Sequence, residues 1–176
     1  LECYVSADDI ESELINTGLM PYVYTHLDGV AWPTLQEMIN LNKRLVVFSD
    51  VADASASQAW YHYVWDFAVE THYSVNDVND FTDDYNRGDS LNDLYIFNHF
   101  VTNGVTGTGM DAESAIANEY NFLLNRIELN NLLKGKFPNF ITVDFFELGN
   151  ALDVVNTLNG GYLGLHHSLK NPEILV

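Results

Sequence analysis

Three long apolar runs, each closed by polar residues, recur along the chain. They cover residues 44–50, 94–100 and 139–146. Continuous apolar runs of this length are typical of strands that are buried on both faces. The intervals between them are too long for hairpins but leave room for a loop and a helix. A shorter stretch, residues 1–5, has the pattern of the end of a fourth strand, so the spacing predicts parallel strands joined through helices.

Helical spacing of apolar residues predicts four helices around these strands. They cover about residues 7–17, 35–42, 111–134 and 150–158. Ser6 and Thr34 begin capping boxes at the first two. Asp111 or Ser114 can cap the third, and Gly135 can end it. Strands and helices thus alternate, which predicts an α/β fold.

Polar side chains stand at the carboxyl end of each long strand. They are Asp50, Asn98 with His99, and Asp144. In parallel α/β folds the carboxyl ends of the strands carry the functional site, so we expect the site at this edge. A barrel and a doubly wound sheet both fit the pattern. No strand is followed by a glycine-rich phosphate loop, which removes the usual signature of a nucleotide-binding sheet.

Three of the candidate site residues each have a functional and a structural interpretation. Asp144 shares a strand face with Thr142, and a buried carboxylate there needs a partner, either a catalytic histidine, an arginine, a substrate hydroxyl or a structural salt bridge. His99 either reaches the same carboxyl edge of the strands as Asp144 or is a half-buried histidine bonded to a carbonyl. Arg87 is the one basic residue of the acidic loop 76–93, and serves as its counter-charge or as a phosphate ligand.

Aromatic residues are dense directly after the first long strand. Trp60, Tyr61, Tyr63 and Trp65 follow one another closely there. Packing in the core is one interpretation of this segment. An aromatic rim around a site for a lipid or a sugar is the other.

The charge of the chain argues against some classes of partner. Seven Lys and Arg residues against 25 Asp and Glu residues give a formal net charge of −18. Scattered basic residues form no patch that replaces counterions on a phosphate backbone, so nucleic acid is not expected as a partner. The clustered Lys and Arg needed for docking on an anionic membrane are also missing. No apolar run approaches the roughly 18 residues of a membrane span.

The rest of the composition bears on folding and on the extent of the domain. Hydrophobic residues make up 47% of the chain, which is enough for a sizeable core. Cys3 is the only cysteine, so neither an intrachain disulfide nor a cysteine zinc site is expected, and the redox compartment stays open. The chain begins with Leu1 in what has the pattern of a strand end. We therefore expect that an upstream part of the domain is missing.

Four ordered segments resemble the carboxyl-terminal half of the PLC-like phosphodiesterases, relatives of the X domain of phosphatidylinositol-specific phospholipase C. The segments are WPTLQEMINLNKRLVVFSD, YHYVWDFAVETHYS, LYIFNHFVT and FPNFITVDFFELGNALDVVNTLN. The resemblance implies an irregular TIM-type βα barrel and a secreted or cell-surface protein. A complete barrel takes about 250 residues. Residues 1–176 would then be the carboxyl-terminal portion of one barrel domain, with its first strands missing.

The resemblance also implies phosphodiester cleavage by two histidines, a general base and a general acid. Both belong to motifs on early strands that this chain lacks, so we expect the catalytic histidines upstream and the fragment alone to be inactive. Asp144 matches the family's aspartate on the last strand, where a carboxylate can orient a catalytic histidine. Asn98 and His99 match the NHF of the penultimate strand, and Arg87 matches an arginine of the preceding loop.

Two further positions complete the set of residues expected to contact the substrate, and a third position is a candidate metal ligand. The substrate set adds Asp50 and Trp65. Glu2 falls where calcium-dependent relatives carry an acidic ligand, so calcium is a candidate cofactor. The acidic loop 76–93 does not have the register of an EF-hand.

The sequence thus predicts a phosphoric diester hydrolase or lyase of phospholipase C type, acting as a monomer on a phosphoinositide or a related phosphodiester. Two alternatives remain open: a non-catalytic barrel that binds lipid or carbohydrate, and a phosphodiesterase of glycerophosphodiester type. Because of the net charge of −18, a lipid substrate would be met through the aromatic segment, or the substrate is a soluble diester.

Overall fold

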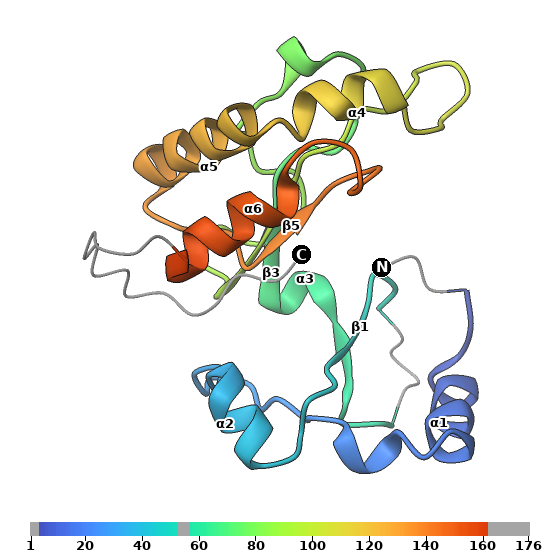
Figure 1. The fold of residues 1–176 in the computed structure, drawn as a ribbon. Coiled ribbons are helices and arrows are strands. Elements are labelled where there is room, and N and C mark those ends of the chain that lie inside the picture. The colour runs from blue at the N-terminus through green and yellow to red at the C-terminus, as the bar shows by residue number, and fades with distance from the viewer. Residues whose placement is uncertain (1–3, 53–56, 162–176) are drawn as a thin grey trace. The chain divides into compact units, whose positions relative to one another are not determined.

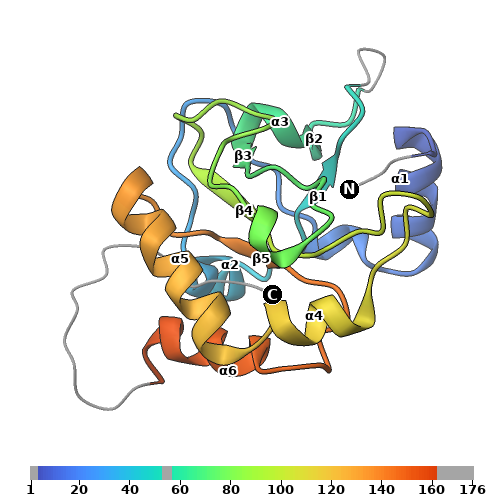
Figure 2. The same ribbon diagram turned by 90° about the horizontal axis from the view of Figure 1, so that it is seen from above.

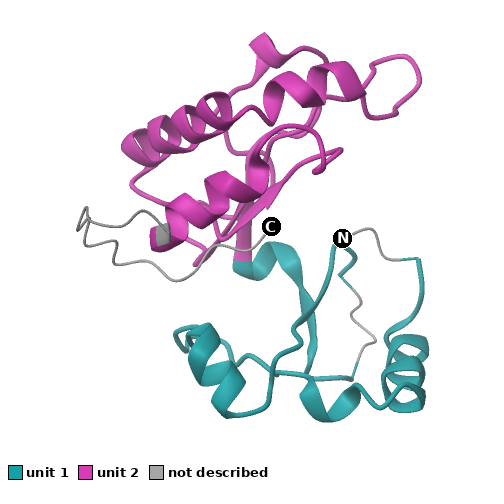
Figure 3. Cartoon of the chain, in the orientation of Figure 1, with its two compact units in different colours: residues 1–67 teal, residues 68–176 magenta. Residues whose placement is uncertain are grey.

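The computed structural model describes residues 4–52 and 57–161. The chain divides into two compact units, residues 1–67 and 68–176 (Figure 3). Both contain parallel strands joined through helices or loops, so the chain is a mixed α/β protein with two small sheets. This confirms the predicted α/β class and the parallel pairing.

Two capped helices of the first unit begin where the sequence predicts. Helix α1 (Ala7–Asn16) starts after Ser6, whose Oγ accepts a hydrogen bond from the backbone N–H of Asp9 at 3.1 Å. Helix α2 (Leu35–Asn40) starts with a complete capping box between Thr34 and Glu37. Both helices are labelled in Figure 1. Such caps satisfy backbone donors that a helix start leaves unpaired.

The sheet of the first unit consists of two short parallel strands. Strand β1 (Val47–Ser49) pairs with β2 (Tyr61–Tyr63), and a 3-10 turn, η1 (Met20–Tyr22), precedes a bridge between Val23 and Leu45. Helix α3 (Val64–Phe67) follows β2 directly.

The second unit carries a three-stranded parallel sheet in the order β3–β4–β5. Its strands are β3 (Ala68–Glu70), β4 (Leu94–Asn98) and β5 (Phe140–Thr142). Asn98 lies opposite Thr142 in the register, and Glu70 lies opposite Ile96. The carboxyl ends of all three strands therefore meet at one edge.

Helices of the second unit cover the sheet and close its core. They are α4 (Asp111–Ala117), α5 (Tyr120–Lys134) and α6 (Ala151–Asn156), with the short turns η2 (Val78–Asp80) and η3 (Thr157–Gly161). Helices α5 and α6 lie side by side in both views (Figures 1 and 2). The core joins buried residues of the sheet and of these helices: Val69, Tyr95, Phe97, Ile141, Leu123, Ile127 and Val154. This packing holds the strand ends in place.

The predicted strands are longer than the observed ones. The runs 44–50, 94–100 and 139–146 contain strands of three, five and three residues. The last run leaves the sheet because Phe145 takes a left-handed backbone conformation, with φ of 49°, which no strand accommodates. Of the stretch 1–5, residues 1–3 lie outside the described residues, and the other two are not in a strand.

The long predicted helix is in fact two helices. Glu119 has extended backbone angles, and its side chain accepts a hydrogen bond from the backbone N–H of Phe122 at 3.0 Å, so it caps α5 and ends α4 before it. Neither Asp111 nor Ser114 is the cap of α4, because Met110 occupies the cap position without a side-chain bond. A continuous helix across residue 119 was therefore a wrong prediction.

A closed barrel is not formed by residues 4–52 and 57–161, whose strands make up two separate sheets. Strand β2 lies in the aromatic segment and β3 follows it closely, and the sequence predicted neither strand. In the part of the chain that the structure describes, no helix combines the length and the apolar character that crossing a membrane requires.

Candidate functional site at the carboxyl edge of the three-stranded sheet

Four polar side chains end or follow the three strands of the second unit. Glu70, Asn98 and Thr142 are the last residues of β3, β4 and β5, and Asp144 comes two residues after β5. The neighbouring strand residues are apolar and buried, so the sheet fixes the backbone from which these side chains extend. This is the edge at which the sequence predicts a site.

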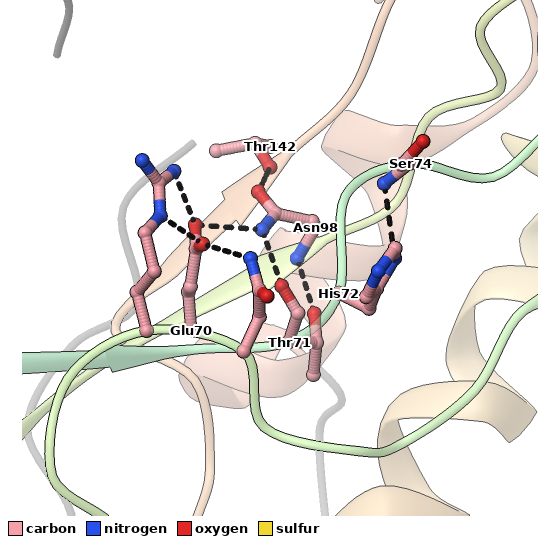
Figure 4. Close-up of polar contacts among 8 residues, drawn as sticks. Glu70, Thr71, His72, Ser74, Asn98 and Thr142 are labelled. Atoms are coloured by element: carbon pink, nitrogen blue, oxygen red, sulfur yellow. Dashed lines mark hydrogen bonds and ion pairs between the residues drawn. The ribbon is translucent and has the colours of Figure 1, made fainter.

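Glu70 is the centre of a hydrogen-bond network at this edge (Figure 4). Its side chain is only 2% exposed. The carboxylate accepts bonds from Arg87, with Nε at 2.5 Å and Nη2 at 3.2 Å, and from the amides of Asn86 at 2.9 Å and Asn98 at 3.0 Å. A buried carboxylate is costly unless it is paired and hydrogen-bonded. These four bonds meet that requirement.

Arg87 reaches Glu70 because its loop runs alongside β3. The backbone N–H of Glu70 donates to the Arg87 carbonyl at 3.0 Å, and the N–H of Asn86 donates to the Glu70 carbonyl at 2.9 Å. Gly88 then turns the chain with φ of +81°, where a Cβ atom would lie 1.9 Å from the Ala68 carbonyl oxygen. Only glycine fits this approach. Arg87 is thus the counter-charge of a strand residue.

Asn98 ties the three strand ends together. Its Nδ2 donates to Glu70 and, at 2.7 Å, to the carbonyl of Thr71, while its Oδ1 accepts a bond from the Thr142 hydroxyl at 2.8 Å. The hydroxyl of Thr71 accepts a bond from the Asn98 backbone N–H at 2.8 Å. The Asn98 amide is buried and its orientation is set from both sides.

His99 lies wholly in the interior. Arg126 has only donors, so its Nη1 donates to His99 Nδ1 at 2.8 Å, and the His99 Nε2–H donates to the Ala117 carbonyl at 2.8 Å. The ring also stacks on Phe81 with centroids 4.7 Å apart. Burial, and then the charge of Arg126, lower the pKa of His99 to about 3. Its geometry is that of the carbonyl-bonded interpretation, with a fully buried ring.

We expect the free energy of unfolding to fall as pH is lowered from 6.5 toward 3, in part through His99. The pKa of His99 is near its ordinary 6.5 in the unfolded chain and lower in the folded protein, so the unfolded state binds more protons over this window. The slope from one such group reaches about 1.4 kcal/mol per pH unit. Urea unfolding of wild type and His99→Gln at several pH values measures it.

The exposed His72 provides the matched control for that measurement. His72→Gln is expected to keep the wild-type pH slope, whereas His99→Gln has a shallower one. Equal slopes in wild type and His99→Gln would contradict the buried, neutral ring.

Asp144 has a half-buried carboxylate at the same edge. Burial raises its pKa. Within residues 4–52 and 57–161, no hydrogen bond or ion pair involves this carboxylate. Its backbone carbonyl accepts a bond from the Asn118 amide at 2.9 Å, and a Cβ atom on Gly109 would lie 2.7 Å from Oδ2. A partly desolvated carboxylate with a raised pKa is typical of functional sites.

The backbone directly after Asp144 is in a strained conformation. The left-handed φ of Phe145 costs a bulky residue roughly 1–2 kcal/mol. The backbone N–H of Leu148 donates to the Phe145 carbonyl at 2.8 Å and helps to hold the turn. Strained residues cluster at functional sites, so the turn supports a role for the carboxylate before it.

Three predicted site residues lie outside the described part of the second unit. Asp50 follows β1 and Trp65 lies in α3, and both belong to the first unit and are partly exposed. Glu2 lies outside the described residues. Among the described residues, no group of three His, Cys, Asp or Glu side chains could hold a metal ion.

One residue of the aromatic segment packs in the core, and another makes a hydrogen bond. Trp60 is 7% exposed and packs in a cluster with Leu14 and Val23, as the core interpretation predicts. The Tyr61 hydroxyl instead donates to the Ser49 hydroxyl at 2.7 Å.

Sequence reasoning missed two residues of the site, Glu70 and Arg126. Glu70 is a charged residue between Val69 and Thr71 in an otherwise apolar strand, and that contrast is a signal for a paired, buried charge. Arg126 occurs in a helical pattern, where nothing in the sequence indicates its buried partners.

Comparison with known proteins identifies relatives along most of the chain. The family model described as PI-PLC X 1 matches residues 3–159. "PI-PLC X domain-containing protein 1" of the fungus Arthroderma benhamiae is 27% identical over 81% of this chain and 50% of its own length. An "Uncharacterized secreted protein" of the same fungus is 28% identical over 98% of this chain and 45% of its own length. The chain thus spans about half the length of these relatives, and no solved structure matches it.

Proposed function

This chain belongs to the PI-PLC X family, and from that membership we propose that the intact protein is a phosphoric diester hydrolase or lyase of phospholipase C type. Its substrate is a phosphoinositide or a related phosphodiester. The observation that carries the proposal is the Asp144 carboxylate, half-buried at the carboxyl edge with its pKa raised by burial. It lies two residues after Thr142, which bonds to Asn98 in the network of Glu70 and Arg87.

We further propose that residues 1–176 are the carboxyl-terminal portion of one barrel domain. Among the described residues, β5 pairs with β4 alone, so its other edge carries backbone donors and acceptors that a further strand can pair with. An upstream strand on this edge would stand next to Asp144. A catalytic histidine at the end of that strand would then be within reach of the carboxylate.

The proposed reaction needs two proton transfers. A histidine acting as general base takes the proton of the attacking hydroxyl, and the oxygen forms a bond to phosphorus. A second histidine, acting as general acid, gives a proton to the leaving oxygen as its bond to phosphorus breaks. Asp144 accepts a hydrogen bond from one of these histidines and fixes its tautomer.

Other residues of the chain would contact the substrate or hold those that do. The Arg87 guanidinium, 41% exposed, binds the phosphoryl group. Asn98 and His99 support the edge from within, since both are buried and bonded to neighbouring residues. Asp50 and Trp65 remain proposed substrate contacts, and calcium at Glu2 remains a proposal.

The test is turnover by the intact protein. We expect it to cleave phosphatidylinositol in vesicles or soluble glycerophosphodiesters, and we expect residues 1–176 alone to be inactive because the catalytic histidines lie upstream. Release of phosphorylated product from each substrate gives the rate. A well-folded intact protein that turns over neither substrate contradicts the proposal, and binding without turnover indicates a non-catalytic module. Activity of residues 1–176 contradicts the upstream histidines.

We also propose that the protein is secreted. The support is the relative called an uncharacterised secreted protein, which matches 98% of this chain.

A further inference from the structure

One carboxylate, that of Glu70, connects Arg87, which the proposed function places on the phosphoryl group, with the buried amide of Asn98. It accepts two bonds from the Arg87 guanidinium and one from the Asn98 amide. These partners come from a loop and from the end of the adjacent strand, 17 and 28 residues further along the chain. Glu70 itself is 2% exposed and cannot meet a substrate at the surface.

We propose that Glu70 is a positioning residue for substrate binding: its buried carboxylate fixes the Arg87 guanidinium in the orientation that receives the phosphoryl group of the substrate, and it holds the buried Asn98 amide that supports this edge. This inference rests on the proposed function, because it assumes that Arg87 meets the phosphoryl group. It adds a residue to which neither the sequence nor the family comparison assigns a role.

The geometry at Arg87 supports an orienting role. Glu70 holds Nε and Nη2, and the Tyr73 ring lies 4.9 Å below the guanidinium carbon, so the plane of the group is fixed from its edge and from its face. A free arginine side chain loses considerable rotamer entropy when it binds an anion. An arginine that is already held in place avoids that cost. The side chain is 41% exposed, so the held group remains accessible to solvent.

The geometry at Asn98 extends the same effect across the sheet. Glu70 fixes Nδ2, and Oδ1 on the other side accepts the Thr142 hydroxyl bond at 2.8 Å. Thr142 is two residues before Asp144. A change at Glu70 would therefore be transmitted through Asn98 to the strand that Asp144 follows.

A different result is expected if the ion pair between Glu70 and Arg87 is purely structural. It stabilises the fold, and its loss lowers the melting temperature without changing the properties of the protein that remains folded. A positioning residue changes the kinetics of the folded protein, and it does so through Arg87. Displacements of about 1 Å in a substrate-binding group can cost about 100-fold in rate.

The experiment compares Glu70→Gln, Glu70→Asp, Arg87→Gln and the double variant Glu70→Gln/Arg87→Gln in the intact protein, well below each melting temperature. Glu70→Gln removes the charge and keeps the size. Glu70→Asp keeps the charge, shifts the guanidinium and provides a folded variant if the glutamine does not fold. Glu128→Gln, the same change at an exposed site on α5, is the matched control. Two quantities are measured: kcat/KM on a soluble diester, and the Kd for inorganic phosphate.

We expect Glu70→Gln and Glu70→Asp to lower kcat/KM by about 10- to 100-fold and to weaken phosphate binding. The double variant should lose less than the product of the two single losses, since Glu70 acts partly through Arg87. Glu128→Gln should match wild type in both measurements.

The two measurements separate this inference from the proposed function. If Arg87→Gln lowers turnover and binding while both Glu70 variants leave them at wild-type levels, the inference is wrong and the proposed function stands. If wild type binds phosphate through Arg87 and Glu70 without any turnover, the inference holds and the proposed catalysis is wrong. If wild type neither turns over the diester nor binds phosphate, both are wrong.

Discussion

Asp144→Asn is expected to lower kcat of the intact protein by roughly three to four orders of magnitude, the cost when a carboxylate that orients a catalytic histidine becomes an amide. The amide nitrogen cannot accept the histidine N–H, so the ring loses the tautomer that the reaction needs. Asp144 is half-buried and lies outside the bonds of the core network, so its side chain should contribute little to folding. Initial rates at saturating substrate measure the effect on kcat. The melting temperature is measured as well and is expected to stay unchanged.

Asp153→Asn is the matched control, because Asp153 is exposed near the start of α6. It should retain wild-type kcat. If Asp144→Asn retains more than about a tenth of wild-type kcat, Asp144 does not orient a catalytic histidine and the assignment of the site is wrong.

Arg126→Ala should destabilise the protein by about 3 kcal/mol or more, the largest loss of folding free energy that we expect from a single change at this edge. The guanidinium donates to the Asn98 and Thr82 carbonyls at 3.0 and 2.9 Å, and to His99. It also lies 4.2 Å from the ring of Phe97. Alanine leaves three acceptors without these donors, and two of them belong to the buried residues Asn98 and His99. The midpoint and slope of urea unfolding give the free energy of unfolding.

Arg44→Ala tests whether the loss is specific to the buried position. Arg44 is exposed, and its contact is the ring of Tyr22, 5.2 Å from the guanidinium carbon. Its removal should cost no more than about 1 kcal/mol. Similar losses in the two variants would contradict the importance of the buried bonds of Arg126.

Local signals predicted the beginnings of elements well. The caps at Ser6 and Thr34 depend on neighbouring residues, so the sequence contains everything that determines them. The ends were harder to predict. An apolar run shows where a strand can lie, but the turn at Phe145 depends on contacts with distant residues. The break at Glu119 was missed because the apolar spacing continues across it.

The candidate site was also predicted only in part, because local signals indicate some of its residues but not their distant partners. Asn98 and Asp144 were found because polar residues that close apolar runs point to the carboxyl edge of a sheet. The partners of these residues come from elsewhere in the chain. Glu70 lies 28 positions before Asn98, and no local pattern connects the two. For His99 the sequence left both a position at this edge and a carbonyl-bonded position open, because it does not show that α4 and α5 enclose the ring.

The bond between Asn98 and Thr142 joins residues 44 positions apart, and the bond between Glu70 and Arg87 closes a loop of 17. Contacts between residues distant in sequence require the closure of a loop, and the chain entropy lost in that closure slows folding. The capped helices need no such closure. We therefore expect the carboxyl edge to be completed after the capped helices have begun to form.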